Sequence, residues 1–205
     1  NPRYDSRSNC NAIIETVSQT LLLGCPNTRI PNGVLKISNF AFLQCKESLT
    51  SIFIPKSVNY IADKTFHDCP NLQSIVVDAK NQRYDSRDNC NALIEYDKLI
   101  VGCQNTIIPY GTRTIKEYAF KDCKNLHTIF IPETVTKIEK YAFDGCGNLK
   151  TIFFASNTPP ELLDHSFPNN NEYDNKMNLY INVKHESSFE YQLRRIFPQH
   201  SFSFY

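Results

Sequence analysis

The sequence contains no tryptophan, and its 22 basic and 21 acidic residues leave a net charge of only +1. A near-neutral chain has no whole-molecule field that would draw it to nucleic acid or anionic lipid, so we expect no nucleic-acid partner. No apolar run approaches the roughly 18 residues that a membrane-spanning helix needs, so we expect no transmembrane segment. A secretion signal is also missing, but the chain opens inside a repeat, and we expect it to be the trimmed remainder of a longer precursor.

Residue patterns typical of enzymes and metal sites are missing too. The five histidines are scattered, and none lies in a nucleophile motif such as GxSxG, so we expect no catalytic residue. No CxxC pair exists among the eight cysteines, and His67 has no counterpart in the equivalent repeats, which argues against zinc. These absences predict a non-enzymatic protein without a cofactor or a bound metal.

What the sequence does contain is repetition at two lengths. NPRYDSRSNCNAIIET at residues 1–16 matches NQRYDSRDNCNALIEY at residues 81–96, at an offset of 80 residues. A shorter repeat lies inside the long one, because Phe42 and Phe66 are 24 residues apart and the corresponding spacing in the second copy is 23. A period of this length falls in the range of leucine-rich repeats.

Each short repeat divides into a turn half and a strand half. In ISNFAFLQCKESLTSIFIP, residues 37–55, the spacing of Phe42 and Cys45 places both on the inward side of a short helical turn. The strand half alternates, so Ile52 and Ile54 should face the core. The proline that follows lacks a backbone N–H and ends the strand ladder there.

Each long repeat begins with a hairpin in place of the Phe and Cys turn. Pairing the arms by a constant sum of residue numbers predicts these opposed pairs: Cys10 with Cys25, Ala12 with Leu23, Ile14 with Leu21, Cys90 with Cys103, Ala92 with Val101 and Ile94 with Leu99. Directly opposed cysteines can have the geometry of a disulfide, so both cysteine pairs stay open as bridges or free thiols. We favour free thiols, because the other four cysteines recur at an inward packing position. These are Cys45, Cys69, Cys123 and Cys146.

The YDSR segments, at residues 4–7 and 84–87, put an aspartate within reach of an arginine and of backbone donors. We interpret them as Asx-type turns that the arginine fastens. Calcium bound at Asp85, Asp88 and Asn89 is the alternative, although three oxygen side chains without a further acidic partner make a poor site.

After Phe154 the repeat pattern decays. Ser166-Phe167 echoes the Ala-Phe pair of the coils, and the remaining signals predict a rigid bend, a polar loop, a strand, a helix and an apolar end. The bend lies at Thr158–Pro160, the polar loop at Asn169–Lys176 and the strand at Leu179 to Val183. The helix runs from Ser187 to about Ile196, and Phe202 with Phe204 form the apolar end. We therefore predict a solenoid at residues 1–157, with two long repeats of one hairpin coil plus two plain coils, and a degenerate repeat with a C-terminal cap at residues 158–205.

The LxxIxIP strand, the AFxxC turn and the YDSRxNCNAIIET hairpin together resemble the BspA-like leucine-rich repeat surface proteins of Bacteroides-type bacteria. The resemblance covers the chain to about residue 154, and the tail resembles the cap of the same family. It implies an α/β repeat solenoid, a right-handed superhelix with inserted β-hairpins, a strand ladder on one face and short turns or helices on the convex side. It also implies a surface-anchored or secreted adhesion protein that carries no catalytic residues.

The outward row of the strand ladder is the candidate binding site. Alignment on the Ile-Pro landmark places Arg29, Phe53, Val76, Ile107, Phe130 and Phe153 in a mostly apolar row, with Ser51, Ser74, Thr128 and Thr151 in a hydroxyl row beside it. Stacked coils would join each row into a stripe, and an exposed apolar stripe usually marks an interaction surface. The alternative is that loops cover this face, or that the phenylalanines only stabilise the ladder by cross-strand packing.

We therefore expect a monomeric protein, exported to the cell surface or beyond, that binds a host or bacterial surface protein through Phe53, Phe130 and Phe153. A carbohydrate-binding module is the alternative, with exposed aromatic rings stacking on sugars. It is weaker, because the chain has no tryptophan and the stripe lacks the carboxylates and amides that hold sugar hydroxyls. A structural spacer that presents another domain is the third hypothesis.

Overall fold

The computed structural model describes residues 2–45, 47–168, 178–181 and 201–204. The chain forms two compact units. Unit 1 comprises Asn1–Tyr96 with Val101–Thr106, and unit 2 comprises Asp97–Ile100 with Ile107–Tyr205. The predicted boundary between solenoid and cap at residue 157 stays a prediction.

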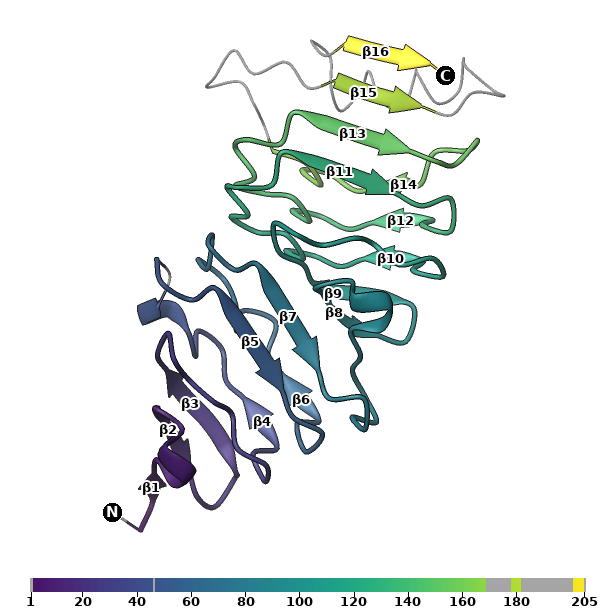
Figure 1. Cartoon of the computed structure of the whole chain (residues 1–205). Coiled ribbons are helices and arrows are strands. Elements are labelled where there is room, and N and C mark those ends of the chain that lie inside the picture. Colours follow the sequence, from purple (N-terminus) through teal and green to yellow (C-terminus); the bar gives the residue numbers. More distant parts are fainter. Residues whose placement is uncertain (1, 46, 169–177, 182–200, 205) are drawn as a thin grey trace. The chain divides into compact units, whose positions relative to one another are not determined.

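Unit 1 contains two sheets built from short strands (Figure 1). The first has the order β1 (Tyr4–Asp5), β2 (Ala12–Glu15), β3 (Thr20–Gly24), β4 (Lys36–Ile37) and β6 (Tyr60–Ile61). The second pairs β5 (Ser51–Ile54) with β7 (Ser74–Val77) in parallel. The unit also holds β8 (Leu93–Glu95) and three 3₁₀ segments, η1 (Arg7–Asn9), η2 (Leu43–Cys45) and η3 (Arg87–Asn89). Each plain coil thus contributes one strand to each sheet.

Unit 2 repeats this arrangement. One parallel sheet contains β9 (Lys98–Val101), most of which lies in this unit, β10 (Thr114–Ile115), β12 (Lys137–Ile138) and β14 (Glu161–Leu162). The other contains β11 (Thr128–Ile131), β13 (Thr151–Phe154), β15 (Asn178–Ile181) and β16 (Ser201–Phe204), and Figure 1 shows their four arrows pointing the same way. Strand ladders of this kind confirm the predicted repeat solenoid.

The core of each unit lies between its two sheets and is built from equivalent side chains stacked coil on coil. Phe42 and Phe66 stack 5.4 Å apart in unit 1, and in unit 2 Phe143 stacks 4.8 Å from both Phe120 and Phe167. Offset or parallel ring pairs at this separation stabilise a core beyond the burial of their area. The stacking confirms that Ser166-Phe167 is a degenerate copy of the Ala-Phe pair.

The turn half of the coils contains less helix than the predicted α/β class requires. Phe42, Cys45 and Leu49 are fully buried as predicted, but the segment around them is a 3₁₀ turn of three residues at η2. Among the described residues there is no α-helix, so this part of the chain is a β-solenoid. A turn half of about ten residues is too short for a stable α-helix, and a tight 3₁₀ turn delivers the same side chains to the core.

The first hairpin has a different register from the predicted one. Ile14 lies opposite Leu21 as expected, but a β-bulge follows, so Ala12 lies opposite Gly24 and not opposite Leu23. Leu22 is the extra residue, and Leu23 turns outward. The predicted opposition of Cys10 and Cys25 is therefore wrong, and Cys10 instead accepts a backbone hydrogen bond from Arg29, at 3.0 Å.

Gly24 gives the physical reason for the bulge. Its N–H donates to the carbonyl of Ala41 at 2.7 Å, and its Cα lies against the ring of Phe42, where a Cβ would clash. Only a glycine fits this inward position. A bulge moves Gly24 to it and keeps Leu21 buried, which a regular antiparallel pair could not do.

The tail is described in part. The predicted strand at Leu179 and Ile181 is confirmed as β15, and Phe202 and Phe204 lie in β16, which pairs with β15 in parallel. The predicted polar loop at 169–176, Val183 and the predicted helix from Ser187 to Ile196 lie outside the described residues.

Candidate binding surface

In unit 1 the two rows form on the outward side of β5 and β7. Parallel pairing puts Ser51 beside Ser74 and Phe53 beside Val76. Phe53 is 50% exposed and Val76 45% exposed, while the intervening residues of both strands are buried. The strict alternation of the strand places these side chains outward, because their neighbours in sequence fill the core.

In unit 2 the same rows run across β11 and β13. Phe130 lies beside Phe153, and Thr128 lies beside Thr151. Phe130 is 52% exposed, and Phe153 is partly covered. The described residues of this unit therefore hold an exposed apolar row with a hydroxyl row two residues away, as in unit 1.

Two of the predicted site residues lie outside the named strands. Arg29, in unit 1, is exposed and precedes the buried Ile30; Ile107, in unit 2, is 71% exposed and precedes the buried Ile108. Both keep the inward and outward alternation of the strand rows. The ten predicted residues thus form two groups of five, one in each unit.

The prediction missed Tyr180. This residue follows Phe153 in the ladder, and the two rings stack 4.7 Å apart. The signal was available, because Tyr180 alternates with the two apolar residues that predicted the strand. The stacking also explains why Phe153 is less exposed than Phe130, so cross-strand packing and surface exposure coexist in one row.

The chemistry available on these rows is desolvation combined with hydrogen bonding. Half-exposed phenylalanine and valine side chains gain free energy when a partner excludes water from them. The adjacent serine and threonine hydroxyls can both donate and accept hydrogen bonds. Apolar surface with a polar rim is typical of a protein–protein interface.

A second aromatic ladder, on the turn side of unit 2, was not predicted. Tyr118 stacks on Tyr141 at 5.4 Å, and Tyr141 stacks on His165 at 5.5 Å. All three backbones have positive φ, which is uncommon for such side chains. Because both faces of Tyr141 are covered, this ladder offers no open ring face at its centre on which a sugar could stack.

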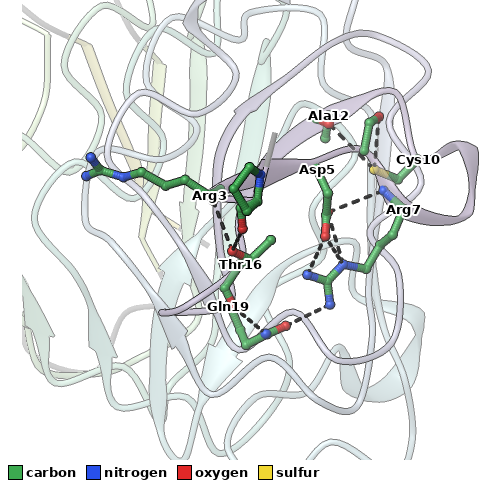
Figure 2. Close-up of polar contacts among 9 residues, drawn as sticks. Arg3, Asp5, Arg7, Cys10, Ala12, Thr16 and Gln19 are labelled. Carbon is green, nitrogen blue, oxygen red and sulfur yellow. Dashed lines mark hydrogen bonds and ion pairs between the residues drawn. The ribbon is translucent and has the colours of Figure 1, made fainter.

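The predicted Asp–Arg turns are confirmed in both hairpins. Figure 2 shows Asp5 held by Arg7, whose Nη2 lies 2.7 Å from Oδ2 and whose backbone N–H also donates to Oδ1. The Arg7 side-chain hydrogen bond holds the pKa of the Asp5 carboxyl below its usual value. In the second hairpin Arg87 binds both oxygens of Asp85. Arginine therefore occupies the carboxylate that the calcium alternative required.

The cysteines pack as small apolar residues. None of the eight, all of which lie in the described ranges, forms a disulfide; seven are buried, and Cys25 is partly exposed. Cys45 Sγ donates to the carbonyl of Gly24 at 3.2 Å, and Cys146 Sγ donates to that of Phe120 at 3.0 Å, in each case one coil back. Burial raises the pKa of Cys90 to about 11. A thiol with so high a pKa is a poor nucleophile at neutral pH.

Nowhere in the described ranges do three His, Cys, Asp or Glu side chains gather closely enough to hold a metal ion. Of the helical segments in those ranges, none has the length and apolar character to cross a bilayer.

Comparisons with known proteins agree on the type of repeat. The family model for the BspA type Leucine rich repeat region matches residues 10–95 and 100–196, in six copies. A leucine rich cell surface protein from Faecalibacterium prausnitzii A2-165 is similar in structure, with 25% identity and a TM-score of 0.52. The match covers 74% of this chain and 46% of that one, so this chain spans about half the length of that relative.

Two further solved structures are more distant. A leucine-rich repeat protein from Eubacterium ventriosum has 24% identity and a TM-score of 0.47, over 75% of this chain and 46% of that one. The pneumococcal vaccine antigen PcpA has 15% identity and a TM-score of 0.41, over 83% and 59%. The search of curated proteins found no match. The family model covers nearly the whole sequence, and the chain therefore belongs to the BspA-type leucine-rich repeat family.

Proposed function

We propose that this protein is a non-enzymatic, exported surface protein of the adhesin type that binds a host or bacterial surface protein. The observation that carries the proposal is the pair of strand-face rows. Phe53 with Val76 in unit 1, and Phe130 with Phe153 in unit 2, present apolar side chains to solvent beside hydroxyl groups. An isolated exposed apolar residue is ordinary on a protein surface, but an ordered row of them is typical of an interaction surface.

Two further points support this proposal. The relative from Faecalibacterium prausnitzii is described as a cell surface protein, which fits an exported protein of the same family. The buried thiols and the arginine-bound aspartates have structural partners, so neither group offers the reactive side chain that catalysis needs.

The double variant Phe53→Ser with Phe130→Ser tests the proposal. Both side chains are about half exposed, so serine should cost little stability but remove the apolar contact with a partner. We expect binding to immobilised host or bacterial surface proteins to fall at least about tenfold, a loss of roughly 1.4 kcal/mol.

Tyr60→Ser is the matched control. Tyr60 has nearly the same exposure, at 47%, but lies on β6 in the other sheet of unit 1. It should leave binding unchanged. Equal loss of binding in Tyr60→Ser, or a double variant that merely unfolds at lower temperature and still binds, would contradict a binding role of the strand face.

A further inference from the structure

Unit 1 contains the one Asn-Gly pair of the sequence, Asn32-Gly33, at the centre of an exposed turn. The N–H of Val34 donates to the carbonyl of Pro31 at 3.3 Å and closes this turn. Gly33 has φ of +98°, a left-handed conformation that glycine adopts without steric cost. The side-chain amide of Asn32 therefore belongs to an exposed residue and is followed directly by a backbone nitrogen that carries no bulky side chain beside it.

Asparagine is one of the chemically labile residues, and here it can react with its own backbone. The nitrogen of Gly33 loses its proton and attacks Cγ of Asn32. The new N–Cγ bond closes a cyclic imide, and the side-chain nitrogen leaves as ammonia. Water then opens the imide at one of its two carbonyls, which yields aspartate or isoaspartate. Apart from its chain neighbours, no heavy atom lies within 4 Å of the place where a Cβ of Gly33 would be, so nothing hinders the attack sterically.

The hydroxyl of Ser57 restrains this reaction. Its Oγ accepts a hydrogen bond from the N–H of Gly33 at 3.0 Å and donates one to the carbonyl of Val34 at 2.8 Å. The first bond engages the proton that the nitrogen must lose, and both bonds hold the turn in place. Attack on Cγ therefore requires a local opening that separates Gly33 from Ser57, and the frequency of that opening limits the rate.

Unit 2 contains the same turn without the reactive amide. Gly111 has φ of +90°, and its N–H donates to Oγ1 of Thr134 at 3.1 Å. Tyr110 stands where Asn32 stands in unit 1. The backbone geometry of this turn therefore does not require an asparagine, and a threonine hydroxyl can take the place of Ser57.

We propose that Asn32 is a self-modification site, at which asparagine converts to aspartate and isoaspartate, and that the Ser57 hydroxyl limits the rate of this conversion. Each conversion adds one negative charge to the turn. Isoaspartate also adds one carbon to the backbone between Pro31 and the fully buried Val34, and should loosen the hydrogen bond that closes the turn. The proposal is independent of the strand-face rows, which consist of other residues.

Incubation of the natural chain in mildly alkaline buffer, followed by trypsin digestion and mass spectrometry, tests the proposal. We expect the peptide of residues 30–36 to gain the mass that replaces an NH₂ group with OH, and to separate into two products. In urea the conversion should be at least about threefold faster, because unfolding frees Gly33 from Ser57. Asn39, which is exposed but precedes Phe40, should stay unchanged. Absence of conversion at Asn32 in the folded chain would overturn the proposal.

Three variants separate the reactive residue from its restraint. Asn32→Gln should abolish the mass gain in this peptide. Ser57→Ala should accelerate conversion of the folded chain at least about threefold, because the N–H of Gly33 loses its acceptor. Ser57→Thr is the matched control and should keep the natural rate, since Thr134 supplies the same acceptor in unit 2. Equal rates for the folded natural chain and Ser57→Ala, or a Ser57→Ala chain that is faster in urea as well, would overturn the assigned role of Ser57.

Discussion

The two hairpins have the same turn but different surroundings. At the residue before each 3₁₀ segment, Ser6 has φ of −131° and ψ of 56°, and Ser86 has −131° and 55°. Inside the segments, Ser8 and Asp88 both have φ of 56°. Yet Leu93 is fully buried, while Ile13 at the equivalent position is largely in solvent.

This difference separates local from tertiary effects. The shared sequence YDSR sets the turn, because the aspartate and arginine bind each other and the turn backbone in both copies. Burial of the flanking side chains depends instead on whether a coil packs against them. Equivalent substitutions in the two hairpins should therefore lower the free energy of unfolding by unequal amounts.

Leu93→Asp should be the most damaging change. It places an unpaired carboxylate in the core of unit 1, and we expect the free energy of unfolding to fall by about 3 kcal/mol or more. Ile13→Asp, its counterpart, should cost less than about 1 kcal/mol. Urea denaturation of the two variants gives the comparison, and similar costs would show that the preceding coil does not distinguish the hairpins.

Tyr84→Phe removes one hydroxyl and should have an intermediate effect. The N–H of Ile61 loses its acceptor in a buried place, which costs about 1–3 kcal/mol. Tyr4→Phe should stay within about 0.5 kcal/mol, because Tyr4 is only partly buried. The midpoint of thermal unfolding distinguishes the two; a larger shift for Tyr4→Phe would contradict this account.

Asp5 predicts a pH-dependent contribution. The hydrogen bond from Arg7 lowers the pKa of Asp5 in the folded chain below its usual value of 3.8. Because the folded pKa is the lower one, the pair stabilises the fold above the unfolded pKa, and this contribution is lost as the pH falls through the folded pKa. Asp5→Asn should therefore be less stable than the natural chain at about pH 7, and the difference should shrink towards about pH 2.

Two further variants serve as comparisons for Asp5→Asn. Asp85→Asn removes the corresponding carboxylate of the second hairpin and should also be less stable than the natural chain, because Arg87 loses its partner. Asp63→Asn removes an exposed carboxylate from an unrelated turn and should leave the free energy of unfolding nearly unchanged. A stability difference for Asp5→Asn that grows as the pH falls would refute the assigned role of the Asp5–Arg7 pair.

The smallest effect concerns thiol reactivity, which leaves the fold intact. Cys25 is partly exposed, whereas its counterpart Cys103 and the neighbouring Cys90 are buried. Only the thiolate reacts with iodoacetamide, and the pKa of Cys90 is about 11 because of burial. Peptide mass spectrometry should find Cys25 alkylated first. Cys103 or Cys90 labelled as fast as Cys25 would be evidence that the second hairpin opens readily.

Much of the fold and part of the site could be predicted from these residues. The spacing of Phe42, Cys45 and Leu49 predicted an inward turn, and all three are buried. Alternation in SIFI and TIFI predicted outward phenylalanines, and Phe53 and Phe130 are half exposed. Whether these rows bind a partner stays a prediction, because the periodicity of a strand determines which way its side chains point and not how tightly they bind a partner.

Other features depended on contacts between distant residues. The bulge at Leu22 arises because Gly24 packs on Phe42, 18 residues further on. Pairing the two arms by a constant sum of residue numbers considers only the arms and therefore could not predict the effect of that contact. The α/β class is not confirmed in the described residues, which contain 3₁₀ turns and no α-helix, because the stacking of one coil on another stabilises a turn that is too short to be a helix alone.

By itself, then, the sequence determined the period of the solenoid, the inward and outward sides of its strands, and the Asp–Arg turns. These depend on spacing along the chain and on neighbours a few residues apart. The hairpin register and the different burial of two nearly identical hairpins depend instead on tertiary contacts. Burial is a property of what packs against a side chain, and two copies of one sequence have different neighbours.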